Sequence, residues 1–194
     1  MGEFNCVVIG DASVGKGGLV TCYAERWNGV RRFSTTPLLT NVKVETDNGH
    51  VKLHMLHIRI RNVCGSVQNL RDFFSDIDLC LMCYSVVDPI SYQHIYSHWF
   101  KEFRQQYPHS PTLLVGTKVD LRTDSSCLGV LRWSNSAPLT SIDGRLLCAD
   151  LGSLSYIECS AKTGQGVKDE FLEAARIVLY YRRPESNLDT DSGD

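Results

Sequence analysis

The 194-residue chain lacks three features that would each indicate a particular setting. It has no apolar run near the roughly 18 residues that suggest a membrane helix. We expect no secretory leader, because an apolar strand-like segment begins at Phe4. With a net charge of only −2, the chain as a whole has no field that attracts nucleic acid or an anionic membrane. The sequence therefore favours a cytoplasmic protein without a nucleic acid partner.

The sequence also lacks a disulfide framework. Its eight cysteines are scattered, and most lie inside apolar segments, as Cys6, Cys22 and Cys148 do. This arrangement predicts buried, reduced thiols. Cys80 and Cys83 have the spacing of a metal or redox pair, but their apolar neighbours and the absence of a second pair favour a core strand.

The composition, with 43% apolar and 22% charged residues, is that of a globular protein. Along the chain, sequence patterns typical of strands alternate with patterns typical of helices. The predicted strands are 4–9, a hairpin over 40–60, 79–86, 112–115 and 156–159; the predicted helices are 18–28, 91–106, 141–151 and 167–181. Residues 61–76 are expected to form a loop with a short helix, and 123–137 an irregular segment. We predict an α/β fold: a doubly wound, mostly parallel sheet with helices on both faces. It would occupy residues 1–182 and be followed by a short, acidic, disordered tail, 183–194.

The most informative stretch follows the first predicted strand. Residues 10–17, the phosphate loop, are Gly-Asp-Ala-Ser-Val-Gly-Lys-Gly. This matches a phosphate-binding pattern in which backbone N–H groups and a lysine surround the phosphates of a nucleotide. The pattern ends in Ser or Thr, whose hydroxyl binds Mg²⁺, but this chain has Gly17. Alone, the stretch fits a glycine-rich turn between a strand and a helix equally well.

Two further loops follow later predicted strands and strengthen the first motif. They are Thr117-Lys-Val-Asp-Leu121 and Glu158-Cys-Ser-Ala-Lys162, which we call the base-recognition loops. In this order and at these separations, the three loops resemble those of Ras-superfamily small GTPases. The Thr-Lys-x-Asp-Leu-Arg form together with Glu-Cys-Ser-Ala is similar to the Rho family, and residues 123–137 have the place and length of the Rho-type insert. The resemblance covers residues 4 to about 182 and implies a P-loop small GTPase fold that binds GTP or GDP.

The chemistry of guanine explains why these residue types suit the role. The Asp120 carboxylate can accept hydrogen bonds from N1–H and the 2-amino group of guanine, whereas adenine would leave it unpaired. In the family, the backbone N–H of Ala161 donates to guanine O6 and the Lys118 stem packs along the base. The resemblance also implies that Thr35 binds Mg²⁺. The implied nucleotide-binding residues are Gly10, Asp11, Ala12, Ser13, Val14, Gly15, Lys16, Gly17, Gly18, Thr35, Thr117, Lys118, Asp120, Leu121, Ser160, Ala161 and Lys162.

Most of the residues that this family uses for hydrolysis are missing, although Thr35 stands at the position of the switch threonine. Gly17 lacks the metal-binding hydroxyl, and ungapped counting places His57 where the aspartate of Asp-x-x-Gly belongs. With a shift, 62–65 is the nearest match to that motif, and Ser66 then replaces the catalytic glutamine. Ala12 adds a methyl group where the family has glycine. We therefore expect no catalytic residue and weakened or absent Mg²⁺ binding, which Gly17→Thr should partly restore.

Three hypotheses follow. The first is an atypical Rho-like protein that binds guanine nucleotide, hydrolyses GTP weakly or not at all, and contacts protein effectors or regulators through switch regions at about 30–40 and 57–76. The second is a nucleotide-independent pseudo-GTPase that acts as an interaction scaffold, and the third an active hydrolase with repositioned residues. We expect a monomer without a prenyl anchor, because no cysteine follows Cys159.

The histidines near these motifs are assigned no role. His94 and His98 are expected on a solvated helix face, and His54 and His57 at an exposed strand edge.

Overall fold

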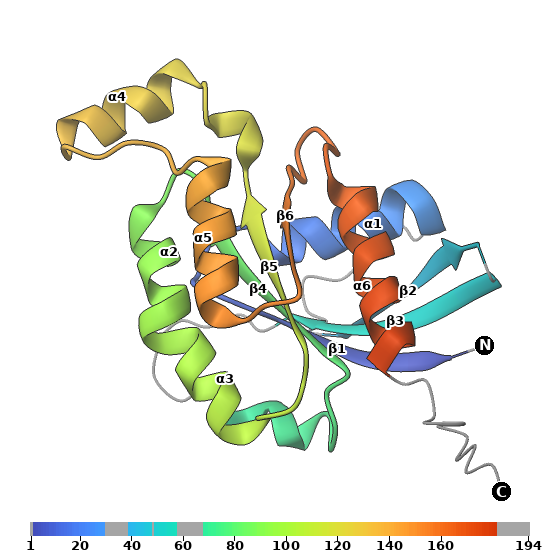
Figure 1. Ribbon diagram of the computed structural model, residues 1–194. Coiled ribbons are helices and arrows are strands. Elements are labelled where there is room, and N and C mark those ends of the chain that lie inside the picture. Colours follow the sequence, from blue (N-terminus) through green and yellow to red (C-terminus); the bar gives the residue numbers. More distant parts are fainter. Residues whose placement is uncertain (1, 30–38, 48, 58–67, 182–194) are drawn as a thin grey trace, which may run out of the picture.

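The computed structural model describes residues 2–29, 39–47, 49–57 and 68–181. Its centre is a six-stranded sheet in the order β2-β3-β1-β4-β5-β6 (Figure 1). The strands are β1 (Glu3–Ile9), β2 (Leu39–Thr46), β3 (Gly49–His57), β4 (Leu79–Ser85), β5 (Thr112–Thr117) and β6 (Ser155–Glu158). Only the β2–β3 pair is antiparallel, as the predicted hairpin requires.

Helices cover both faces of the sheet, which confirms the predicted doubly wound fold (Figure 1). On one face lie α1 (Lys16–Asn28) and α6 (Val167–Tyr181). On the other lie α5 (Ser141–Leu151) and a helical run made of α2 (Pro89–His94), a π-helical turn (Ile95–Trp99) and α3 (Phe100–Gln106). The chain between β3 and β4 includes a 3₁₀ turn, Gln68–Asp72.

The central strand β4 shows why the sheet has two apolar faces. All seven of its residues are buried, and successive side chains of a strand point to opposite faces. Leu79, Leu81 and Cys83 accordingly pack with α1 and α6, whereas Cys80 and Met82 pack with the other layer. The core assignment of both cysteines is therefore correct, and no group of three or more His, Cys, Asp or Glu in the described ranges is placed to hold a metal ion.

The segment 123–137 differs from its prediction as an irregular region. It contains the helix α4 (Ser125–Trp133), which projects beyond the sheet (Figure 1). The Asp124 side chain caps the helix by accepting a hydrogen bond of 2.9 Å from the Cys127 N–H. Of the serines that suggested a loop, Ser125 and Ser126 therefore lie in the first turn of a capped helix.

Within the described ranges, no helix combines the length and hydrophobicity needed to cross a bilayer. The predicted tail, 183–194, lies outside those ranges.

Candidate nucleotide-binding site

The phosphate loop connects β1 to α1 through backbone conformations that favour glycine. Gly10 and Gly15 have φ angles of 135° and 113°, in a region that side chains disfavour. A Cβ atom at Gly10 would also lie only 2.0 Å from the Cys83 carbonyl oxygen of β4. The loop therefore packs closely against the sheet, and it places the N-terminus of α1 near the C-terminal end of β1.

Lys16 is held inside this loop. Its Nζ donates hydrogen bonds of 2.6 Å to the carbonyl oxygens of Gly10 and Asp11, and the residue is only 6% exposed. Burial lowers the pKa of the Lys16 ammonium below its ordinary value. A phosphate beside Lys16 would raise this pKa again, because a nearby anion favours the charged amine.

The acidic residue of the loop is clamped by the helical run on the far layer. The Asp11 carboxylate accepts 2.7 Å hydrogen bonds from the Trp99 indole Nε1 and from Nδ1 of His94. His94 is therefore a partner of the phosphate loop, not part of a solvated helix face. Sequence reasoning missed this role because the π-helical turn changes which side chains share a face between His94 and Trp99.

We expect Trp99→Phe to lower the free energy of unfolding by about 2–3 kcal/mol, because Asp11 loses a partly buried, charge-assisted hydrogen bond and some packing is lost. Urea denaturation measures the change. Trp133→Phe is the matched control, since Trp133 is 93% exposed and its replacement should have almost no effect. Equal stabilities of the two variants would show that the clamp contributes nothing.

The base-recognition loops leave β5 and β6 at the same edge of the sheet as the phosphate loop. Thr117 connects the first of these loops to the phosphate loop. Its Oγ1 lies 2.5 Å from the Val14 carbonyl oxygen and 2.8 Å from the Tyr84 carbonyl oxygen, and its one hydroxyl proton is shared between these two acceptors. Lys118 has a positive φ of 59°, which turns the chain sharply after β5. The Ser160 hydroxyl donates a hydrogen bond of 2.6 Å to one Asp120 carboxylate oxygen, so this carboxylate is held in one orientation.

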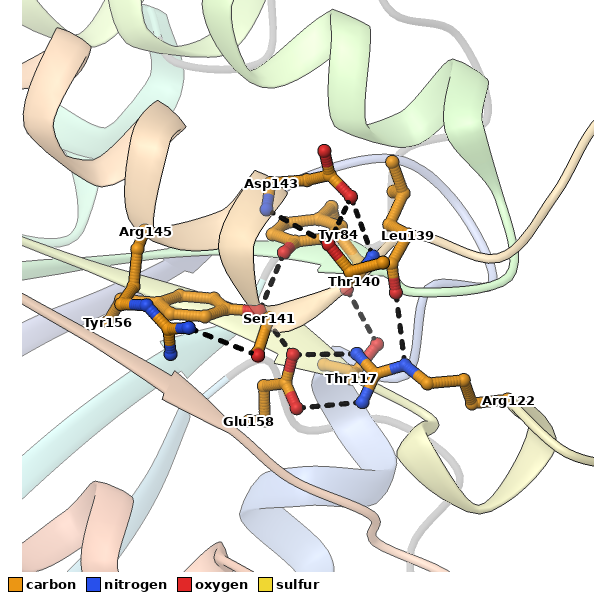
Figure 2. Close-up of polar contacts among 10 residues, drawn as sticks. All are labelled: Tyr84, Thr117, Arg122, Leu139, Thr140, Ser141, Asp143, Arg145, Tyr156 and Glu158. Atoms are coloured by element: carbon orange, nitrogen blue, oxygen red, sulfur yellow. Dashed lines mark hydrogen bonds and ion pairs between the residues drawn. The ribbon is translucent and has the colours of Figure 1, made fainter.

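An ion-pair network braces the two base-recognition loops against each other (Figure 2). The Arg122 guanidinium donates hydrogen bonds of 2.8 and 2.6 Å to the two carboxylate oxygens of Glu158, and its Nε donates one of 3.0 Å to the Leu139 carbonyl oxygen. The Tyr156 hydroxyl donates 2.7 Å to Glu158 and contacts the Tyr84 hydroxyl at 2.8 Å. Burial would raise the pKa of Glu158, but the hydrogen bonds from Arg122 and Tyr156 outweigh it and hold that pKa below its ordinary value. Both acid and base remain charged at neutral pH.

The structure thus brings together most of the predicted site residues. The phosphate loop and residues 117–121 and 160–162 converge, and a Cβ built on Gly18 would lie 3.6 Å from that of Ala161. Thr35, the predicted metal ligand, lies outside the described ranges, as do residues 58–67 with the shifted Asp-x-x-Gly match.

His57 lies where sequence reasoning did not expect it. It ends β3, an interior strand of the sheet, and is only 6% exposed. A Cβ atom built on Gly17 would lie 3.2 Å from His57 Nε2 and 3.4 Å from its Cδ2. The expectation of an exposed strand edge is therefore wrong for His57, whose ring packs against the first turn of α1.

This position does not fit Mg²⁺. Magnesium prefers oxygen ligands in octahedral geometry, whereas the two residues that meet here offer a glycine and an imidazole. In the sequence, Gly17 and His57 are two separate departures from the family pattern: one lacks the metal-binding hydroxyl and the other replaces the aspartate. In the fold, the two residues are neighbours.

Comparison with known families agrees with the sheet topology and with the convergence of the three loops. The model of the Ras family matches residues 5–180, which is most of the chain. Members bind guanine nucleotide with Mg²⁺ and act on effectors. The chain belongs to the Ras family of small GTP-binding signalling proteins.

Proposed function

We propose that this protein is an atypical, Rho-like member of the family that binds guanine nucleotide and hydrolyses GTP weakly or not at all. One contrast carries the proposal. The phosphate loop and the base-recognition loops are assembled and braced, whereas a histidine ring packs against Gly17 where the family pattern has a metal-binding hydroxyl.

Binding is supported by groups that suit each part of a guanine nucleotide. Lys16 and the N-terminus of α1 would hold the phosphates. Asp120 would accept from N1–H and the 2-amino group of the base, while Ser160 fixes the carboxylate. Lys118, Leu121, Ala161 and Lys162 would complete the base pocket.

Weak hydrolysis follows from the charge that the transition state develops. Small GTPases stabilise that charge with Mg²⁺ and orient the attacking water with a glutamine. Here the hydroxyl after Lys16 is absent, and neither alignment of the sequence supplies the glutamine. Ala12 would crowd the space beside the phosphate as well.

The assignment to a Rho-like branch rests on sequence form and on one element of the fold. Arg122, in the Thr-Lys-x-Asp-Leu-Arg form, pairs with Glu158, in the Glu-Cys-Ser-Ala form. The extra segment 123–137 carries a helix, α4, directly after the first of these loops. We propose that protein effectors or regulators contact the switch regions, about 30–40 and 57–76.

The nucleotide content of freshly purified protein tests the proposal. We expect near-stoichiometric guanine nucleotide with GTP predominant, and single-turnover hydrolysis slower than the ~10⁻⁴ s⁻¹ basal rate of a competent small GTPase. Lys16→Ala, which removes the loop cation, should be recovered with little nucleotide. GDP alone would show that hydrolysis or GDP selection persists. A folded protein without nucleotide would favour the interaction scaffold.

A further inference from the structure

His57 and Gly17 form a matched pair that only the fold brings together. Parallel pairing of β3 with β1 places His57 opposite Val8, so that β3 ends beside the start of the phosphate loop. The buried ring lies against the first turn of α1, and Gly17 is the residue whose missing side chain makes room for it. A hydroxyl-bearing residue at position 17 would press its Cβ against the ring.

The position of the ring matters because the first turn of α1 is where phosphate oxygens would collect. Free backbone N–H groups and the positive end of the helix dipole attract anions there. In the described residues, Lys16 is the cation held within the phosphate loop. A neutral imidazole carries an N–H on one ring nitrogen and a protonated imidazole on both, so His57 can donate from Nε2, the nitrogen nearest Gly17, in the protonated form and in the neutral form whose proton is on Nε2.

We infer that His57 takes the place of the metal ion: it donates a hydrogen bond to the nucleotide phosphates, and guanine nucleotide binds without a divalent cation. This inference rests on the proposed function, because it assumes that the phosphates occupy the phosphate loop. It explains why the two departures occur together. A hydroxyl without a carboxylate would leave a metal half-coordinated, whereas a glycine with a histidine makes a metal-free contact.

Equilibrium titration with fluorescent GDP and GTP tests the inference, in buffer with Mg²⁺ and in buffer with EDTA. We expect the wild-type protein to have the same dissociation constant in both. His57→Ala should weaken binding about 10- to 100-fold in both buffers, which is the loss expected for one hydrogen bond to a charged group.

His54→Ala is the matched control. His54 lies on the same strand, but its ring contacts Asn41 at 2.7 Å and Glu3 at 3.0 Å, away from the loop. Its replacement should leave both dissociation constants unchanged. Thermal melting of each variant shows whether it folds.

A converse experiment restores the metal pattern. Gly17→Thr alone should weaken binding without creating Mg²⁺ dependence, because the new side chain crowds His57. Combined with His57→Asp, it supplies a hydroxyl and a carboxylate, and EDTA should then weaken binding at least about tenfold. The sequence alone favoured the single substitution, and the position of the ring explains why two are needed.

The outcomes separate this inference from the proposed function. If the wild-type protein binds guanine nucleotide but EDTA weakens binding strongly, the inference is overturned and the proposed function stands. An unchanged affinity in folded His57→Ala also overturns it. If the wild-type protein binds no guanine nucleotide in either buffer, the proposed function fails and the inference fails with it.

Discussion

Replacing Glu170 with leucine should raise the free energy of unfolding at about pH 8 by roughly 4 kcal/mol. Glu170 is a fully buried carboxyl group in the first turns of α6, among the apolar residues that pack α6 on the sheet. Neither of its oxygens has a strong hydrogen-bond partner in the described part of the chain, where Cys159 offers only a weak thiol donor. Burial therefore raises the pKa of Glu170 to about 8 from its usual 4.5.

The direction of the pH dependence follows from that shift. Because the folded protein holds the Glu170 proton more tightly than the unfolded chain, folding is favoured at low pH. Stability is then lost as the pH rises from about 4.5 to about 8. Urea denaturation across this range should show wild-type stability falling and Glu170→Leu staying level.

Two further variants distinguish ionisation from packing. Glu170→Gln cannot ionise, so its stability should also be level with pH, but it keeps a buried polar group and should gain less than leucine. Asp169→Asn makes the same chemical change at the exposed neighbour and should keep the wild-type slope. A wild-type stability that does not fall between the two pH limits would contradict the burial of the carboxylate.

Asp120→Ala should weaken guanine nucleotide binding by at least about a thousandfold, because a site built to pair with polar groups loses that much when a partner is missing. Two donors on the base would be left without an acceptor, and the Ser160 hydroxyl would lose the carboxylate that it orients. Titration with fluorescent GDP in the wild type and the variant measures the change.

Asp124→Ala is the control for this substitution. Asp124 lies four residues further on and caps α4 through the Cys127 N–H, so its loss should cost about 1 kcal/mol of stability and leave affinity intact. If Asp120→Ala binds guanine nucleotide as tightly as the wild type, Asp120 does not pair with the base and the proposed base pocket is wrong.

Local patterns predicted the parts of the fold that local forces determine. The alternation around residues 47–49 gave the β2–β3 hairpin, the continuous apolar run gave β4, and helical spacing gave α6 over the predicted residues. The three loops were found because each is a contiguous motif directly after a strand.

What escaped prediction depends on contacts between distant parts of the chain. The π-helical turn brings Trp99 to Asp11, 88 residues away, and no window of sequence contains both. His57 reaches Gly17 only because β3 pairs with β1. Glu170 is one of several acidic residues in its helix, and only the packing of α6 on the sheet shows that it is buried.

The hydrogen bond from the Trp99 indole to Asp11 also allows intrinsic tryptophan fluorescence to report on the phosphate loop. The three tryptophans differ sharply in their contact with water: Trp99 is fully buried, Trp27 is 38% exposed and Trp133 is 93% exposed. Indole emission shifts to longer wavelength in polar surroundings, so the three residues report from different environments. Because Trp99 is hydrogen-bonded to the phosphate loop, its blue-edge fluorescence follows events at that loop without an added label, while Trp133 serves as an internal reference on α4.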